Sequence, residues 1–124
     1  MHPNDLQEPE LPEPVAAFIR AVNAGDLGAL VDTFADQALV NDELREYWDK
    51  RSITEWAERE VITQHLVMRV AKIVRNHDHT VVAATVDGSF DKRGLPDPLI
   101  VTFYFSCRDD RLVQLLILRN EPDQ

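Results

Sequence analysis

The carboxyl group of Asp42 is the strongest candidate for chemistry in this sequence. Residues 39–44 alternate as a β-strand does, so Val40 and Asp42 share one face of it. If the face that holds Val40 is buried, the Asp42 carboxyl group is partly removed from water, and its pKa rises unless it is paired. A carboxyl group in such a site can act as a general acid or base.

Thr102, Tyr104 and Tyr47 are candidates for contact with a ligand. The alternation of residues 99–107 predicts a strand in which Thr102 and Tyr104 share a face. The Tyr104 hydroxyl can donate a hydrogen bond to a ligand oxygen or to a partner in the core. Tyr47, next to Trp48, either lines the mouth of a cavity or fills the core near a loop.

Residues 76–79, Asn-His-Asp-His, have the composition of a polar turn. Neighbouring side chains on a turn rarely converge on one ion, and no third cluster of ligands completes a metal site. The sequence also lacks a Gly-rich phosphate loop and the Cys-x-x-Cys, Gly-x-Ser-x-Gly and His-Glu-x-x-His motifs. We therefore expect neither a metal ion nor an organic cofactor.

Three amphipathic helices must position these residues. Gly25, in a left-handed conformation, would end the first helix, and Asp26 would cap the second. A capping box formed by Ser52 and Glu55 predicts the start of the third. The apolar faces of the three helices are Val15, Phe18, Ile19 and Val22, then Leu27, Leu30, Val31 and Phe34, then Ile53, Trp56, Ala57 and Val61.

Four long strands are predicted after the helices, at residues 65–75, 80–90, 99–107 and 111–119. Helices followed by a run of antiparallel strands indicate an α+β fold. Because both faces of the strands are largely apolar, we expect a homodimer through the open face of the sheet. In the first strand, Leu66, Met68, Val70 and Val74 would share one face, and Val67, Ala71 and Ile73 the other.

Composition limits the class of protein and its partners. The net charge of −9 over 124 residues argues against nucleic acid or an anionic membrane as the main partner. No apolar run is long enough to span a membrane, and residues 1–11 lack the pattern of a secretory signal. Cys107 is the only cysteine, so an internal disulfide is impossible, and a reducing cytoplasm is the expected setting. We expect one domain at residues 12–119, with a flexible acidic tail at 1–11 and a short tail at 120–124.

The stretch from Phe18 to Asp42 resembles the nuclear transport factor 2-like superfamily, in particular its SnoaL-like and ketosteroid-isomerase-like branches. The matching pattern is Asn-Ala-Gly-Asp, then Leu-x-x-Leu-x-x-x-Phe-Ala-Asp-x-Ala, then Val-x-Asp, and a later helix from Arg51 extends it. The resemblance covers about residues 12 to 119. It implies a cone, in which a curved antiparallel sheet of about four long strands and one or two short ones wraps three helices and leaves a cavity.

The resemblance also implies roles for single residues. In the ketosteroid-isomerase-like branch, the carboxylate at the position of Asp42 is the general base that moves a proton next to a carbonyl group. Isomerases of that type also use a Tyr on the first helix and a protonated Asp on the penultimate strand. Phe18 stands at the first place and Thr102 or Phe103 at the second. This departure argues against steroid-type isomerisation.

A second catalytic style of the superfold pairs a His with an Asp at the end of the first helix. His65 lies near the place of that His, but Asn23 or Ala24 stands where the Asp would be. Either Asp42 replaces the missing partner, or His65 is an ordinary residue at a helix–strand junction. Trp56 matches a position that often forms part of the pocket wall.

We therefore expect a SnoaL-like domain that binds a small apolar, oxygen-bearing molecule. Asp42 and His65 would be its catalytic residues in an isomerase, cyclase, dehydratase or hydrolase without a cofactor. The pocket would be lined by Phe18, Tyr47, Trp56, Thr102 and Tyr104. The alternative is a cone of the same fold that binds a ligand or a protein partner without catalysis.

Overall fold

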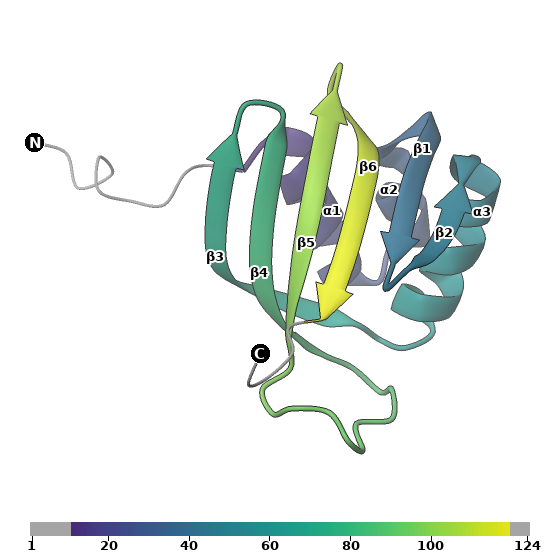
Figure 1. Cartoon of the computed structure of the whole chain (residues 1–124). Helices are drawn as coiled ribbons and strands as arrows, with labels where there is room; N and C mark the ends of the chain where they lie inside the picture. The colour runs from purple at the N-terminus through teal and green to yellow at the C-terminus, as the bar shows by residue number, and fades with distance from the viewer. Residues whose placement is uncertain (1–10, 120–124) are drawn as a thin grey trace, which may run out of the picture.

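The computed structural model describes residues 11–119 (Figure 1). The predicted tails lie outside the described residues, apart from Leu11. The helical elements are α1 (Glu13–Ala24), α2 (Leu27–Asp32), α3 (Asp49–Ala57) and the π-helical turn η2 (Glu58–Ile62) that continues α3. The strands are β1 (Phe34–Asp42), β2 (Arg45–Trp48), β3 (Val67–Asn76), β4 (His79–Asp87), β5 (Ile100–Arg108) and β6 (Arg111–Arg119).

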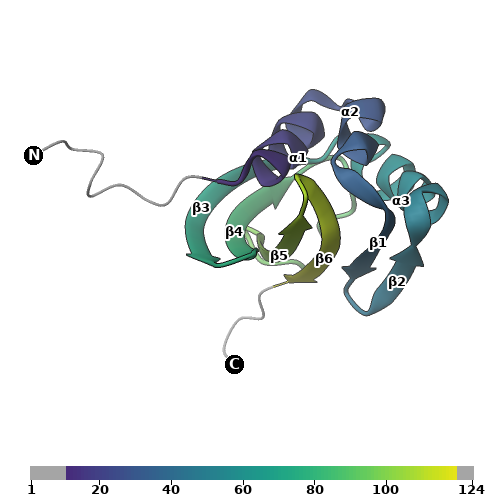
Figure 2. The same cartoon turned by 90° about the horizontal axis from the view of Figure 1, so that it is seen from above.

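All six strands form one sheet in the order β2-β1-β6-β5-β4-β3. Neighbouring strands are antiparallel except for β1 and β6, which are parallel. The sheet is strongly curved, and the helices lie along its concave side (Figure 2). The predicted α+β class and the cone-shaped sheet around three helices are confirmed. β1 is nine residues long, so five strands are long and only β2 is short.

The junction between α1 and α2 forms as the sequence predicts. Gly25 ends α1 with φ 66°, and its backbone N–H reaches the carbonyl groups of Ala21 and Val22. A left-handed residue at this place is easiest for glycine because it has no Cβ atom. Asp26 then caps α2, since its Oδ1 accepts a hydrogen bond from the Ala29 N–H at 3.0 Å.

The second helix ends earlier than predicted. The Thr33 hydroxyl donates to the Leu30 carbonyl at 2.7 Å, and the Thr33 carbonyl accepts from the Leu112 N–H at 2.7 Å. The chain is thereby drawn into pairing with β6, and Phe34 becomes the first residue of β1. The prediction that Phe34 belongs to the helix was therefore wrong, although its side chain is fully buried as expected.

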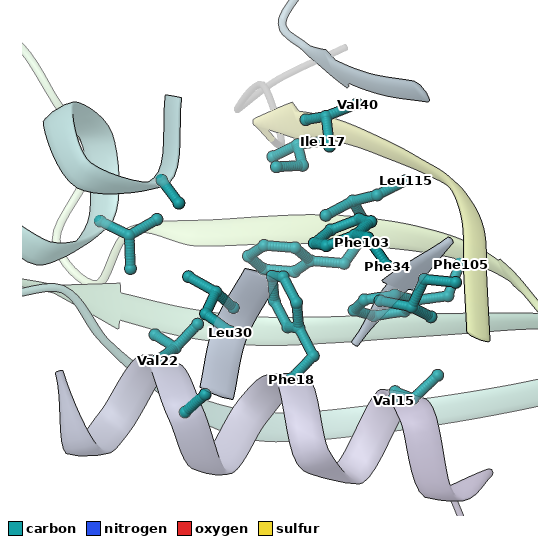
Figure 3. Packing of buried hydrophobic residues seen from close by; sticks show 14 of the residues in the cluster. Val15, Phe18, Val22, Leu30, Phe34, Val40, Phe103, Phe105, Leu115 and Ile117 are labelled. Atoms are coloured by element: carbon teal, nitrogen blue, oxygen red, sulfur yellow. The ribbon is translucent and has the colours of Figure 1, made fainter. Parts of the chain in front are cut away.

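The core lies between the helices and the concave face of the sheet, with the Phe18 ring near its centre (Figure 3). The ring centroid of Phe18 is 6.1 Å from that of Phe34, 6.4 Å from Phe103 and 5.2 Å from Phe105. Two of these contacts are edge-to-face, the geometry that the charge distribution of aromatic rings favours. Phe18 thus fixes the distance between α1 and the central strands.

A β-bulge at Ala71 changes the faces of β3. The pairing with β4 shifts between Val70 and Lys72, so that Ile73 is opposite the buried Val82 and Val74 is on the outer side. The side chain of Val74 is accordingly exposed. The predicted faces hold for Met68 and Val70 but were wrong after the bulge, because one additional residue reverses the alternation.

Candidate functional site

A pocket of about 490 Å³ lies between α1, the end of α3 and the open end of the sheet. Its inner wall is apolar, and its outer part carries charged side chains. The lining from the secondary structure elements includes Phe18, Val22, Asp42, Trp56, Glu60, Val61, Met68, Val101, Phe103 and Ile117. The loop between β4 and β5, residues 88–99, adds Phe90, Asp91, Arg93, Leu95 and Leu99.

Asp42 is the last residue of β1, and its side chain is half-buried. The prediction that it shares a face with Val40 is confirmed, because Val40 is fully buried and Asp42 lines the pocket. Its Oδ2 accepts a hydrogen bond from the Trp56 Nε1 at 2.9 Å. Burial raises the pKa of Asp42, and the Trp56 bond lowers it by a smaller amount. The charge of Glu60 raises this pKa further, while Arg45 and Arg59 lower it. The net effect is a carboxyl group that keeps its proton to higher pH than usual.

Trp56 serves both the core and the pocket. It is 1% exposed and belongs to the buried stripe of α3 with Ile53 and Ala57. Its indole N–H would be an unsatisfied donor in this setting without the Asp42 carboxyl group, and such a group is costly to bury. The two side chains therefore hold each other: the fold positions Trp56, and Trp56 orients Asp42.

Tyr47 lies behind Trp56 and does not line the pocket itself. The two ring centroids are 6.3 Å apart. The Tyr47 hydroxyl accepts a hydrogen bond from Arg59 Nη2 at 3.1 Å, and the Arg59 guanidinium carbon is 5.6 Å from the centre of the Tyr47 ring. Arg59 Nε also donates to Glu60 Oε2 at 3.0 Å. Tyr47 thus supports the pocket wall through Trp56 and Arg59.

Glu60 is a pocket residue that the sequence analysis missed. It lies in η2, where the helix changes from the α to the π form. A signal was available, because Glu60 follows Trp56 by four positions and therefore falls near the same helical face. The π-helical turn itself gives no recognisable pattern in the sequence.

His65, Thr102 and Tyr104 are not brought together with Asp42. His65 is an exposed residue with φ 53° that follows η2, and its Nδ1 is 3.2 Å from the Ser89 Oγ. Thr102 and Tyr104 project from the face of β5 opposite to the buried Phe103, and Tyr104 is 39% exposed. None of the three lines the pocket that contains Asp42. Of the seven predicted site residues, Asp42, Phe18 and Trp56 line this pocket, and Tyr47 contacts Trp56 from behind.

A second hollow of about 990 Å³ lies on the other side of the β4–β5 loop. It shares Met68, Val86, Phe90, Leu95 and Leu99 with the first pocket. Asn23, at the end of α1, lines this hollow and bonds the backbone of Met68 twice: Oδ1 accepts from the Met68 N–H at 2.8 Å, and Nδ2 donates to its carbonyl at 3.0 Å. Asn23 thereby ties α1 to the edge strand β3.

Residues 11–119 provide neither the side-chain cluster of a metal site nor a helix that could cross a membrane. These residues contain no group of three His, Cys, Asp or Glu side chains arranged to hold a metal ion. His79, from the predicted turn, instead places its Nδ1 2.9 Å from the Ser106 Oγ. Over the same range, every helix is too short or too polar to cross a membrane.

Comparisons with known proteins add to this geometry. The model of the SnoaL-like domain family matches residues 15–115. A candidate polyketide cyclase from Sinorhizobium meliloti is similar at 29% identity with a TM-score of 0.78, over 87% of this chain and 95% of that one. No curated protein matches the chain.

Two more distant structures share the fold. A protein from Catenulispora acidiphila with a ketosteroid isomerase-like fold, in complex with trimethylamine, has 20% identity and a TM-score of 0.73, over 88% of this chain and 86% of that one. The second is an epoxide hydrolase/cyclase-like enzyme that has a role in pyran ring formation in the polyether salinomycin. It has 18% identity and a TM-score of 0.71, over 90% of this chain and 91% of that one.

Proposed function

The chain belongs to the SnoaL-like domain family, and on this premise we propose that it is a cofactor-independent acid–base enzyme acting on a small, apolar, oxygen-bearing molecule. The family assignment also confirms the predicted resemblance to the nuclear transport factor 2-like superfamily. The observation that carries the proposal is the half-buried Asp42 carboxyl group, which bonds Trp56 and lines a pocket that also offers apolar surface.

The lining supports this class of substrate. Phe18, Phe103 and Ile117 offer aromatic and aliphatic surface to a ring or chain, and Asp42 offers a polar contact beside them. The volume of about 490 Å³ lies within the range of small-molecule sites. A carboxyl group with a raised pKa can exchange a proton with a substrate oxygen or an adjacent carbon.

The names of two similar proteins agree with such chemistry. One is a candidate polyketide cyclase, and the other is an epoxide hydrolase/cyclase-like enzyme in pyran ring formation. Both names describe reactions on oxygenated molecules in which protons must be moved. His65 is left out of the proposal, because it lies on the exposed turn beside Ser89.

Binding is tested by a thermal-shift screen of small cyclic ketones, hydroxyketones and epoxides. We expect ligands of wild type to give smaller shifts with Asp42→Asn, which keeps an acceptor for Trp56 but cannot donate a carboxyl proton. Asp36→Asn is the matched control, since Asp36 lies on the same strand with a side chain that is 95% exposed. Equal shifts in all three proteins would show that Asp42 does not touch the ligand.

Catalysis is tested with 2-tetralone, a cyclic ketone with acidic protons beside its carbonyl group. In D₂O, ¹H NMR follows the replacement of these protons, and we expect wild type to accelerate it and Asp42→Asn to lose most of the effect. Ligand binding without any exchange would favour the non-catalytic cone over the enzyme.

We also propose that the outer face of the sheet pairs with a second copy of the chain. One row across this face consists of Val74, Val81, Tyr104 and Leu116 on four adjacent strands. Val74 and Tyr104 are among the most exposed large apolar side chains of residues 11–119. A self-complementary apolar face of this kind suits a two-fold dimer.

A further inference from the structure

We propose that Glu60 is a second catalytic residue of this pocket. Glu60 acts as the general base that removes a proton from the substrate, and Asp42 acts as the general acid that donates one. This inference rests on the proposed function, because it assigns the acid and the base of that same site. It reverses the role that the resemblance alone implies for Asp42, which is that of the base.

The geometry gives each carboxyl group one held oxygen and one free oxygen. Asp42 Oδ2 accepts from Trp56 Nε1, and Glu60 Oε2 accepts from Arg59 Nε. Within residues 11–119, Asp42 Oδ1 and Glu60 Oε1 have no hydrogen-bond partner. Both side chains line the same pocket. A carboxyl group fixed through one oxygen presents the other to a ligand in a defined direction, as proton transfer requires.

Glu60 lies within the π-helical turn η2. Residues 58–62 take the wider π form, which adds a residue to the turn and rotates the following side chains. Glu60 is half-buried toward the pocket, whereas Glu58 in the same turn is exposed and does not line it. Short π-helical segments occur often at functional sites, and no other one is present within residues 11–119.

The two carboxyl groups have different surroundings. Burial favours the neutral form of Asp42, and the nearby negative charge of Glu60 favours it further, so the pKa of Asp42 is raised. Glu60 instead bonds the Arg59 guanidinium at 3.0 Å, and its side chain is 36% exposed. Two carboxyl groups in such different environments supply an acid and a base at one pH.

The chemistry can be written for a ketone. Glu60 takes a proton from the carbon beside the carbonyl group, and the electron pair of that C–H bond forms a C=C bond. The π electrons of the carbonyl group move to its oxygen, which takes the proton of Asp42. The product is an enol, with Glu60 protonated and Asp42 ionised, and exchange with water restores both groups.

The first test measures exchange of the 2-tetralone protons against pH. For wild type we expect a bell-shaped profile that rises as Glu60 ionises and falls as Asp42 loses its proton. Glu60→Gln should lose the rising limb and reduce the rate by a factor of about 10² to 10⁴, the usual contribution of a general base. Glu60→Asp should recover part of the rate, and the control Glu58→Gln should match wild type.

The outcomes separate the inference from the function on which it rests. If wild type does not exchange the protons, the proposed function is wrong and the inference fails with it. If wild type exchanges them and Glu60→Gln does so equally fast, only the role of Glu60 is wrong.

A second test needs no substrate. In a Trp48→Phe background, Trp56 is the only tryptophan, and its fluorescence should follow the protonation of Asp42 through their hydrogen bond of 2.9 Å. We expect Glu60→Gln to move the midpoint of this titration to lower pH, because it removes a negative charge beside Asp42, and Glu58→Gln to leave it in place. An unchanged midpoint in Glu60→Gln would overturn the inference, because the charge of Glu60 would then have no effect on the protonation of Asp42.

Discussion

At the scale of single residues, the pair of Asp42 and Trp56 connects stability to the site. The Trp56 N–H needs an acceptor within the core, and the Asp42 carboxyl group supplies it at 2.9 Å. This hydrogen bond holds the Asp42 carboxyl group in a place where its charged form is poorly solvated. The same burial that costs folding free energy raises the pKa of Asp42, as the proposed acid role requires.

A dependence of stability on pH follows. The pKa of Asp42 is raised in the folded state above its ordinary value of 3.8, so the folded state holds the proton more tightly than the unfolded state. Stability is therefore lost as pH rises from the unfolded to the folded pKa, and the loss persists above it. We predict that Asp42→Asn gains stability relative to wild type over this interval, as urea midpoints at several pH values will show.

The control for this prediction is Asp36→Asn, whose exposed carboxylate should give no such gain. A wild type that becomes more stable than Asp42→Asn as pH rises would contradict the sign of the argument. It would mean that the ionised carboxylate is better solvated in the folded chain than burial implies.

The sequence predicts some residues of the site and not others, for physical reasons. Asp42 could be predicted because alternation relates it to Val40, and Val40 had to be buried. Thr102 and Tyr104 were assigned to the wrong side, because alternation separates two faces without saying which one is inner. Val101, Phe103 and Phe105 occupy the inner face of β5 instead. Glu60 was missed although it follows Trp56 by four positions, and nothing in the sequence marks the π-helical turn in which it lies.

At the scale of secondary structure elements, Asn23 has a role that the family comparison alone does not suggest. The resemblance implies that Asn23 or Ala24 stands where another catalytic style needs an Asp. In the structure, Asn23 bonds both polar backbone groups of Met68 on the edge strand β3. Its amide offers one donor and one acceptor, which matches the two groups of a strand residue. Asn23 thus makes the two hydrogen bonds with Met68 that a neighbouring strand would otherwise make.

We predict that Asn23→Ala destabilises the fold by about 1–3 kcal/mol, because a part-buried N–H and a carbonyl group lose their partners. Urea denaturation measures this cost, and hydrogen exchange of the Met68 amide should become faster. Asn23→Asp keeps the acceptor but not the donor, so an intermediate loss with a still protected Met68 amide is expected. Unchanged Met68 exchange in Asn23→Ala would contradict the proposed role.

The boundaries of the elements show how far local patterns extend. Gly25 and Asp26 act as predicted because their effect is confined to the adjacent turns. The third helix starts at Asp49, before the predicted capping box, and the Asp49 Oδ1 accepts from the Ser52 N–H at 3.1 Å. The end of α2 depends instead on a backbone bond to Leu112, about eighty positions away. No local pattern contains that information.

At the scale of the whole molecule, the proposed dimer depends on the open face of the sheet. We predict that wild type is a dimer by sedimentation velocity and that Tyr104→Glu is largely monomeric, because a charge would be placed in the middle of the apolar row. Leu44→Glu is the control, since Leu44 is 83% exposed but lies in the turn between β1 and β2. A monomeric wild type, or a dimer unaffected by Tyr104→Glu, would rule out this interface.

The β4–β5 loop has open space on both of its sides, since Phe90, Leu95 and Leu99 face the pocket of Asp42 and the second hollow alike. A ligand larger than the pocket that contains Asp42 would therefore push this loop toward the second hollow and would not compress the core. The rigid part of the site, Asp42 with Trp56, would stay in place while the opposite wall yields. Such a protein should tolerate substrates of different length while handling the same functional group.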